Sequence, residues 1–252
     1  MGFLMKELDE NDLERSAIVF SPHPDDETLG CGGTIIRKKI AGADVKIIFM
    51  ADGCRSHRHL IPENKLKFIR TNEALAACKK LGVKKSDTIF LEYEDNKLMK
   101  NQNSATSKVL EILIHQEPEE IFIPYHREKH PDHSATNKIV ISALEIYQRK
   151  LNVFEYPIWF WVHWPWTSLS RNNFHFWRNS LASGLYLLKE FQCSVKIADV
   201  LKLKREALEQ HKSQMSRLIP DPGWFILNDV SNGEFLECFF QEHEVFHRYF
   251  FT

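Results

Sequence analysis

Two clusters of histidine and aspartate, each directly after a short apolar run, constrain this chain more than any other feature. The first cluster reads SPHPDDET over Ser21–Thr28 and follows the run Ala17–Phe20. The second covers His126–His133 and follows the run Ile121–Ile123. An apolar run that enters a turn-rich segment is typical of a buried strand that ends there. Ligands bind at the carboxyl ends of strands in open α/β sheets, so the two clusters could close on one metal ion.

The chain between and around these clusters alternates strand and helix patterns. This alternation predicts a Rossmann-like, three-layer α/β sandwich with a mostly parallel sheet. Right-handed crossovers would then place both clusters on one edge of the sheet. The expected strands are Ala17–Phe20, Val45–Met50, Thr88–Leu91, Glu120–Ile123 and Asn152–Tyr156, and the expected helices are Thr28–Ala41, Glu63–Leu81, Ser104–His115 and Ser134–Lys150. Residues 1–16 have the pattern of a polar lead-in.

The rest of the chain has a different character. Residues 157–177 are very rich in aromatic side chains, which favours core packing or an oligomer interface for most of them and a stacking surface for a substrate for one or two. Ala198–Leu218 has the pattern of one charged amphipathic helix, and Glu234–Phe251 could hold a last strand or helix. We therefore expect a single domain over residues 1–252, with a core at about 17–156 and a C-terminal cap region at about 157–252.

Composition excludes several classes of protein. The net charge of -1 gives no general attraction to nucleic acid or to a membrane surface. No apolar run approaches the roughly 20 residues of a membrane span. The five cysteines are scattered and form no C-x-x-C pair, which indicates reduced thiols in a cytoplasmic protein. The run GCGG at Gly30–Gly33 lacks the third glycine of a dinucleotide-binding loop, so we expect it to bring the helix close to the metal loop instead.

The residue types in the two clusters suit a catalytic metal. Such a site takes three ligands from His, Asp or Glu and keeps one position for water. His23 and Asp26 could bind one ion from the first loop, and His130 or His133 could supply the third ligand. Asp25 would then be free to accept a proton from the water. The alternative is a turn with a helix N-cap, which needs only one of these aspartates.

The motifs HPDDE at His23–Glu27 and HPDH at His130–His133 together resemble the LmbE-like, or PIG-L, family of zinc-dependent N-acetylglucosaminyl deacetylases. Weaker similarity extends to the run RTNE at Arg70–Glu73 and to HKSQ at His211–Gln214. The resemblance implies that His23, Asp26 and His133 bind zinc and that Asp25 is the general base. It also implies that His130 stabilises the oxyanion or protonates the amine, and that Arg70 and His211 contact the substrate.

The resemblance implies hydrolysis of an N-acetyl group on an amino sugar or amino-sugar conjugate, with release of acetate. The metal could also be Fe²⁺ or another divalent ion, because imidazole and carboxylate suit several. Two alternatives stay open: a metal-dependent amidase or esterase on a non-sugar acyl substrate, and a non-catalytic sugar- or nucleotide-binding Rossmann module. The expected partner is a small amino-sugar molecule, with no nucleic acid, no membrane span and a possible homo-oligomer.

Three further side chains have ordinary structural explanations on spacing alone. Arg70 lies on an expected helix and could belong to a solvated face. His211 and Gln214 are three residues apart on one helical face, where a hydrogen-bonded packing pair is as reasonable as a substrate contact.

Overall fold

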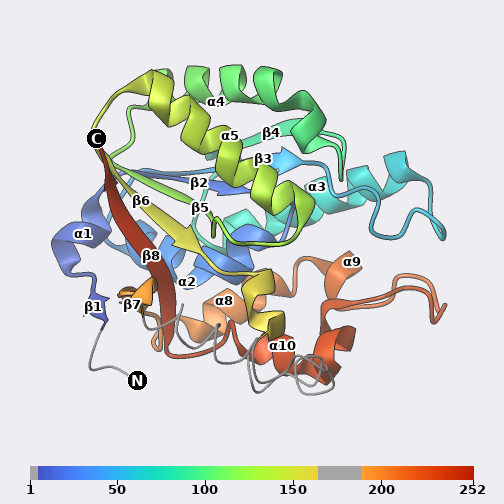
Figure 1. The fold of residues 1–252 in the computed structure, drawn as a ribbon. Coiled ribbons are helices and arrows are strands. Elements are labelled where there is room, and N and C mark those ends of the chain that lie inside the picture. The colour runs from blue at the N-terminus through green and yellow to red at the C-terminus, as the bar shows by residue number, and fades with distance from the viewer. Residues whose placement is uncertain (1–4, 164–188) are drawn as a thin grey trace.

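The computed structural model describes residues 5–163 and 189–252. Within these ranges one eight-stranded sheet runs through the protein in the order β1-β7-β8-β6-β5-β2-β3-β4 (Figure 1). Five neighbouring strands, β2 to β6, pair in parallel, and β8 joins antiparallel to both β6 and β7. The strands are β1 (Lys6–Glu7), β2 (Ala17–Ser21), β3 (Val45–Ala51), β4 (Thr88–Tyr93), β5 (Glu120–Pro124), β6 (Leu151–Tyr156), β7 (Cys193–Lys196) and β8 (His243–Phe251).

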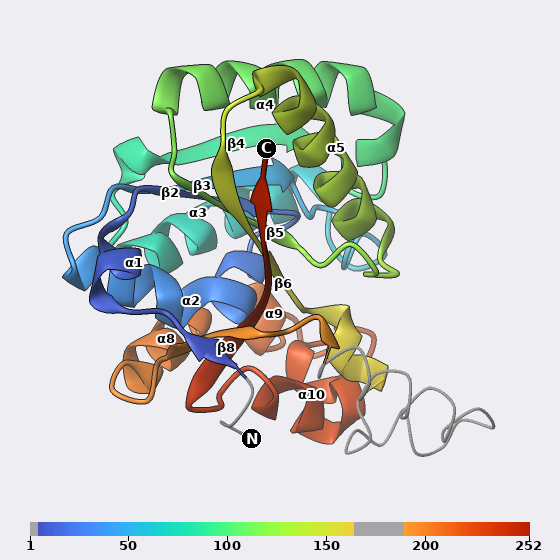
Figure 2. The ribbon, with the colours of Figure 1, turned by 60° about the vertical axis from the view of Figure 1, so that its left-hand side comes forward.

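Helices cover both faces of the sheet, which confirms the predicted α/β sandwich (Figures 1 and 2). The described helices are α1 (Glu10–Glu14), α2 (Asp26–Ile40), α3 (Glu63–Lys80), α4 (Gln102–Gln116), α5 (Pro131–Tyr147), α8 (Leu201–Leu208), α9 (Lys212–Met215) and α10 (Glu234–Glu237). Side chains of α4 and α5 pack with Ile18 and Phe20 of β2, whereas those of α2, α3 and α8 pack with Ala17 and Val19. The central strand β2 is thus buried on both faces, as parallel strands usually are.

The sheet order reverses direction beside β2, and this places the two polar clusters together. The chain runs from β2 outward through β3 and β4, then returns to lay β5 and β6 on the other side of β2. Such a reversal is a topological switch point, where the loops at the carboxyl ends of the two central strands diverge and leave a crevice. The first cluster follows β2 and the second follows β5, so both lie at this crevice.

The ends of the chain differ from the sequence-based expectations. The supposed polar lead-in holds the edge strand β1 and the short helix α1. The single helix expected over Ala198–Leu218 is two helices, because α8 ends at Leu208 and α9 starts at Lys212. The expected cap does more than cover the sheet, since β7 and β8 extend it.

The glycines of α2 approach other partners than the metal loop. A Cβ atom at Gly33 would lie 2.5 Å from Cγ2 of Ile197, and one at Gly32 would lie 3.1 Å from Cγ of Lys204. The close packing is therefore directed at the segment after β7 and at α8, and Gly30 packs equally closely on the ring of Tyr156 in β6. Of the aromatic segment 157–177, residues 164–177 lie outside the described residues. No helix in the described ranges is long and apolar enough to cross a membrane.

Candidate active site

The loop between β2 and α2 is shaped by its own polar side chains. The Asp26 carboxylate accepts a hydrogen bond from the backbone N–H of His23 at 3.0 Å. Glu27 accepts the backbone N–H of Asp25 at 2.9 Å, and the Ser21 hydroxyl donates to the carbonyl of His23 at 2.6 Å. These bonds close a tight turn in which Asp25 has φ of 131°, a left-handed conformation that costs an L-residue roughly 1–3 kcal/mol.

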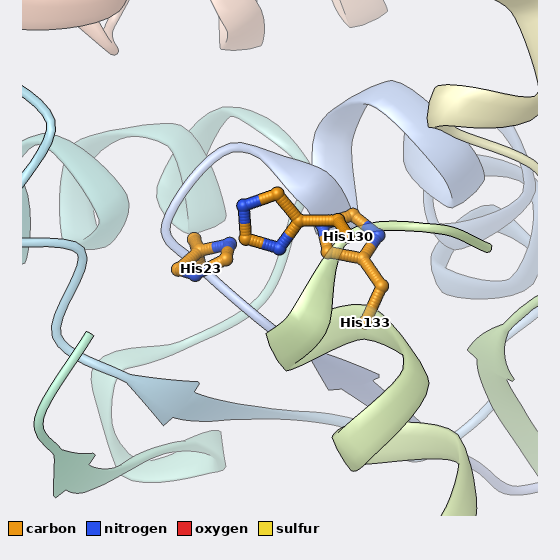
Figure 3. A group of neighbouring side chains, drawn as sticks. All are labelled: His23, His130 and His133. Carbon is orange, nitrogen blue, oxygen red and sulfur yellow. The ribbon is translucent and has the colours of Figure 1, made fainter. Parts of the chain in front are cut away.

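Asp26 lies between two of the histidines that are expected to bind the metal. Asp26 Oδ2 lies 3.3 Å from His23 Nδ1 and 3.2 Å from His133 Nε2. Ligands of a tetrahedral ion with bonds of about 2.0–2.1 Å lie about 3.3–3.4 Å apart, so these spacings match a zinc-like centre. His130 is the N-cap residue of α5, and its ring joins those of His23 and His133 with ligand nitrogens within 4.8 Å of one another (Figure 3).

The outer nitrogen of His23 is held by carboxylates. His23 Nε2 lies 3.1 Å from Asp132 Oδ2 and 3.5 Å from Asp95 Oδ1. Burial alone would lower the pKa of His23, but its acidic neighbours, led by Asp132, outweigh burial and raise the pKa well above its usual value. In the neutral ring that a metal ion would bind, a proton on Nε2 that is donated to Asp132 leaves the lone pair on Nδ1, which faces Asp26. Metal-bound histidines commonly have such a carboxylate on their second nitrogen.

Asp25 is buried beside these donors, and its carboxyl is easy to protonate. Burial, together with the nearby Asp26 charge, raises the pKa of Asp25 to about 6, although the Arg70 guanidinium lowers it in part. Arg70 Nη2 lies 3.3 Å from Asp25 Oδ2, and Arg70 also donates to the carbonyls of Pro24 and Gly53. Arg70 is 3% exposed, so the solvated-face explanation is wrong.

His211 lies behind the loop rather than in the crevice. Its side chain is fully buried, and its Nε2 lies 3.0 Å from Glu27 Oε1. Burial alone would lower the pKa of His211, but the Glu27 charge outweighs burial and raises it. Glu27 in turn holds the backbone of Asp25. The side chain of His211 thus pairs with Glu27, whereas that of Gln214 donates to the Ser213 hydroxyl at 3.2 Å, so the expected His211–Gln214 pair is replaced by a contact that acts indirectly on Asp25.

A cavity of about 240 Å³ opens over the site. Its polar side contains His23, Asp25, Asp26, Arg70, His130 and His133, which are all of the expected site residues except His211. The lining also includes apolar side chains, namely Leu29, Ile158, Trp159, Phe225, Ile226, Leu227, Val230 and Phe235. The Trp159 ring is nearly parallel to the rings of His130 and Phe235, with centroid distances of 6.1 Å and 5.2 Å. Among the aromatic residues in the described part of this segment, Trp159 lines the cavity, whereas its neighbour Phe160 packs against Tyr125 and Phe191.

Sequence reasoning missed several residues that hold this site together. From the sequence, no role was assigned to Asp132 of the HPDH motif or to Glu27 of the HPDDE motif. Asp95 follows β4, and its position after a parallel strand was a signal that could have revealed it. His57 was considered structural or exposed; it is buried, lines the cavity and stacks on Trp224 at 4.2 Å.

The fold and the site define a class: an α/β protein with a cluster of His and Asp side chains that could hold a metal ion, and an adjacent buried carboxylate, at the switch point of its sheet. The family model described as PIG-L, GlcNAc-PI de-N-acetylase, matches residues 18–144, half of the 252-residue chain. This chain belongs to the PIG-L family, which confirms the resemblance carried by the two motifs.

Relatives with curated names agree with that membership. The chain is 31% identical over 144 residues to a Bacillus cereus protein named "Probable N-acetyl-alpha-D-glucosaminyl L-malate deacetylase 2". That match covers 52% of this chain and 62% of the relative, so the chain spans less than two thirds of that relative's length. It is also 24% identical over 228 residues to the diacetylchitobiose deacetylase of Thermococcus kodakarensis, covering 85% of this chain and 73% of the relative.

The fold is shared with solved structures. That of N,N'-diacetylchitobiose deacetylase from Pyrococcus horikoshii superposes with a TM-score of 0.66 at 21% sequence identity, covering 96% of this chain and 87% of the other. At this identity the superposition supports the common fold.

Proposed function

We propose that this protein is a zinc-dependent hydrolase that removes the N-acetyl group from an N-acetylglucosamine-type amino sugar or its conjugate and releases acetate. The observation that carries the proposal is the placement of Asp25. This carboxylate lies buried in the same cavity as the metal donors, in a strained backbone conformation that Glu27 and Arg70 hold. The names of the relatives, each a deacetylase, support the same chemistry.

His23, Asp26 and His133 would hold the ion. When bound, zinc polarises the acetyl carbonyl and makes a water molecule more acidic. Fe²⁺ fits the same ligand types and is the first alternative to test.

The side chains of the chain supply the proton transfers. Asp25 accepts the proton of the attacking water, because its carboxylate lies beside the proposed metal ligands without being one of them, and because its pKa is raised to about 6. Burial and the charges of the neighbouring histidines lower the pKa of His130 to about 4, so its ring is neutral in the resting site. A neutral imidazole can donate one N–H to the oxyanion that develops on the acetyl group. Asp25, or His130 after it gains a proton, then protonates the departing amine.

The apolar side of the cavity would receive the rest of the substrate. Trp159 lines the cavity next to His130 and is only partly buried, so its ring could contact the apolar part of a sugar. Arg70 borders the cavity, but its guanidinium already contacts the Asp25 loop, so we propose that it mainly positions Asp25. His211 would act through Glu27 on the same loop.

The decisive experiment measures acetate release by the zinc-loaded protein from a panel of N-acetylglucosamine derivatives with varied aglycones. Release that a chelator abolishes and that returned zinc restores is the expected result. The panel should also contain acyl esters and non-sugar amides, the substrates of the alternative hydrolase. Hydrolysis of those compounds alone would overturn the amino-sugar assignment, and no hydrolysis of any compound by metal-loaded protein would favour the binding-module alternative.

A further inference from the structure

A second group of histidine and carboxylate side chains lies outside the cavity described above. The His126 cluster consists of His126 after β5, Glu155 of β6, Glu190 before β7 and His247 of β8. Potential ligand atoms of His126, Glu190 and His247 all lie within 4.8 Å of one another. Four segments that are distant in sequence thus bring two imidazoles and two carboxylates together.

The two nitrogens of His126 face different carboxylates. His126 Nδ1 lies 2.6 Å from Glu155 Oε2, a short hydrogen bond in which the ring donates its proton to the carboxylate. This bond fixes the tautomer and leaves a lone pair on Nε2. His126 Nε2 lies 3.8 Å from Glu190 Oε2, which is too long for a hydrogen bond. A carboxylate that holds one imidazole nitrogen while the other faces a second ligand is the arrangement found around metal-bound histidines.

His247 completes the group. Its Nδ1 lies 3.9 Å from Glu190 Oε2 and 3.6 Å from Glu155 Oε2. This atom is buried and has no hydrogen-bond partner among the described residues. A buried ring nitrogen without a partner is unfavourable, and a cation between it and Glu190 would give this nitrogen a partner.

The carboxylates are held in place by other side chains. Tyr125 Oη and Arg127 Nη2 both donate to Glu190, the latter at 3.1 Å. Asn137 donates to Glu155 Oε1 at 3.0 Å, and the Tyr249 hydroxyl donates to the same oxygen at 3.3 Å. These bonds orient the carboxylates before any ion arrives, which lowers the cost of binding. Because His126 is about one third exposed, an ion can reach the group from solvent.

We propose that the His126 cluster is a second divalent transition-metal site, in which His126 Nε2, His247 Nδ1 and Glu190 Oε2 bind Zn²⁺ and Glu155 orients His126. The observed spacings of 3.8 and 3.9 Å are slightly wider than the roughly 3.3–3.4 Å of a tetrahedral zinc centre, so small side-chain rotations suffice. Two imidazoles and one carboxylate favour Zn²⁺ over Mg²⁺ or Ca²⁺, which prefer oxygen alone. The ion would tie the loop between β5 and α5 to β8.

Zinc stoichiometry of the full-length protein tests this site without reference to catalysis. Metal-free protein is equilibrated with buffered Zn²⁺, and bound metal is counted by elemental analysis and by calorimetric titration. The wild type is expected to bind two ions per chain, and His247→Gln one. The matched control is His243→Gln, an exposed histidine on the same strand, which should still bind two. The count of two rests on the proposed zinc site in the cavity; a single ion in the wild type that His247→Gln still binds, or two ions in His247→Gln, would overturn the proposal.

Two further variants guard against a loss caused by misfolding. His126→Gln should also bind one ion, with the circular dichroism spectrum and melting temperature of the metal-free wild type. Glu155→Gln should keep the second ion but bind it about 10- to 100-fold more weakly, because the orienting carboxylate is lost. Unchanged affinity in Glu155→Gln and a retained second ion in His126→Gln would both contradict the assignment. The readout is independent of the proposed deacetylation, since a substrate panel that fails does not alter the ion count.

Discussion

Substitution of Asp132 by Asn probes how the metal centre is held. Asp132 Oδ2 accepts from the backbone N–H of Asn96 at 2.7 Å and lies 3.1 Å from His23 Nε2. Burial alone would raise the pKa of Asp132, but the hydrogen bond from His23 outweighs burial and lowers it, so the side chain is a carboxylate at neutral pH. Asp132→Asn removes that charge with almost no change in size.

The expected magnitude follows from the contacts that remain. In Asp132→Asn the amide oxygen can take the place of Oδ2 and keep the hydrogen bonds from His23 and Asn96. The amide nitrogen then replaces Oδ1, so only the long hydrogen bond from the Leu98 N–H, which is 3.4 Å in the wild type, is lost. Asp95, 3.5 Å from His23 Nε2, can also compensate in part. Loss of an orienting carboxylate weakens metal binding by about 10- to 100-fold. We expect the lower end, about tenfold, or about 1.4 kcal/mol.

Competition with a chromophoric chelator measures this affinity at pH 7. The matched control is Asp44→Asn, which changes an exposed aspartate that pairs with Lys46 and should leave zinc affinity unchanged. Equal zinc affinity in Asp132→Asn and wild type would refute the inference that Asp132 orients His23. Adding Asp95→Asn to Asp132→Asn should weaken binding further, because no carboxylate then faces that nitrogen.

Four other outcomes are expected. Asp25→Asn should retain zinc while turnover, measured by acetate release, falls by about 10²- to 10⁴-fold, whereas His133→Ala should lose the metal. Unchanged turnover in Asp25→Asn would refute the assignment of Asp25 as the general base. Burial raises the pKa of Asp25 to about 6, and the base acts when it is ionised, so kcat/KM should fall as the pH drops. A bound cation favours the ionised carboxylate, so the acid limb of the pH profile should lie at or below about pH 6 in the metal-loaded protein. Arg70→Met should move that limb to higher pH, since the guanidinium lowers the Asp25 pKa, and a fixed limb in the pH profile would speak against their contact. Gly33→Ala should lower the midpoint of urea unfolding. The new Cβ would lie 2.5 Å from Ile197 Cγ2, and the overpacking should cost about 1–3 kcal/mol, more than the gain of about 1 kcal/mol in helix propensity. A higher midpoint would contradict this reasoning.

The local pattern of the sequence was enough to locate most elements of the fold. Apolar runs and helical periodicity predicted β2 to β6 and α2 to α5 to within a few residues. These signals are reliable because a strand buried on both faces must be apolar throughout, whereas a helix that covers it must be apolar on one side. The C-terminal elements were harder to predict. The break between α8 and α9 and the pairing of β7 with β8 depend on distant partners, so local periodicity does not reveal them.

The sequence by itself also determined which side chains could form a metal centre, because HPDDE and HPDH each place ligand types after a strand. Only the tertiary structure decided that β5 lies directly beside β2, which brings His133 Nε2 to 3.2 Å from Asp26 Oδ2. It also decided that His211 is buried against Glu27 and that Asp132 faces His23. The physical reason is that strand order, burial and hydrogen-bond partners arise from packing between segments far apart in the chain, which motif spacing does not encode.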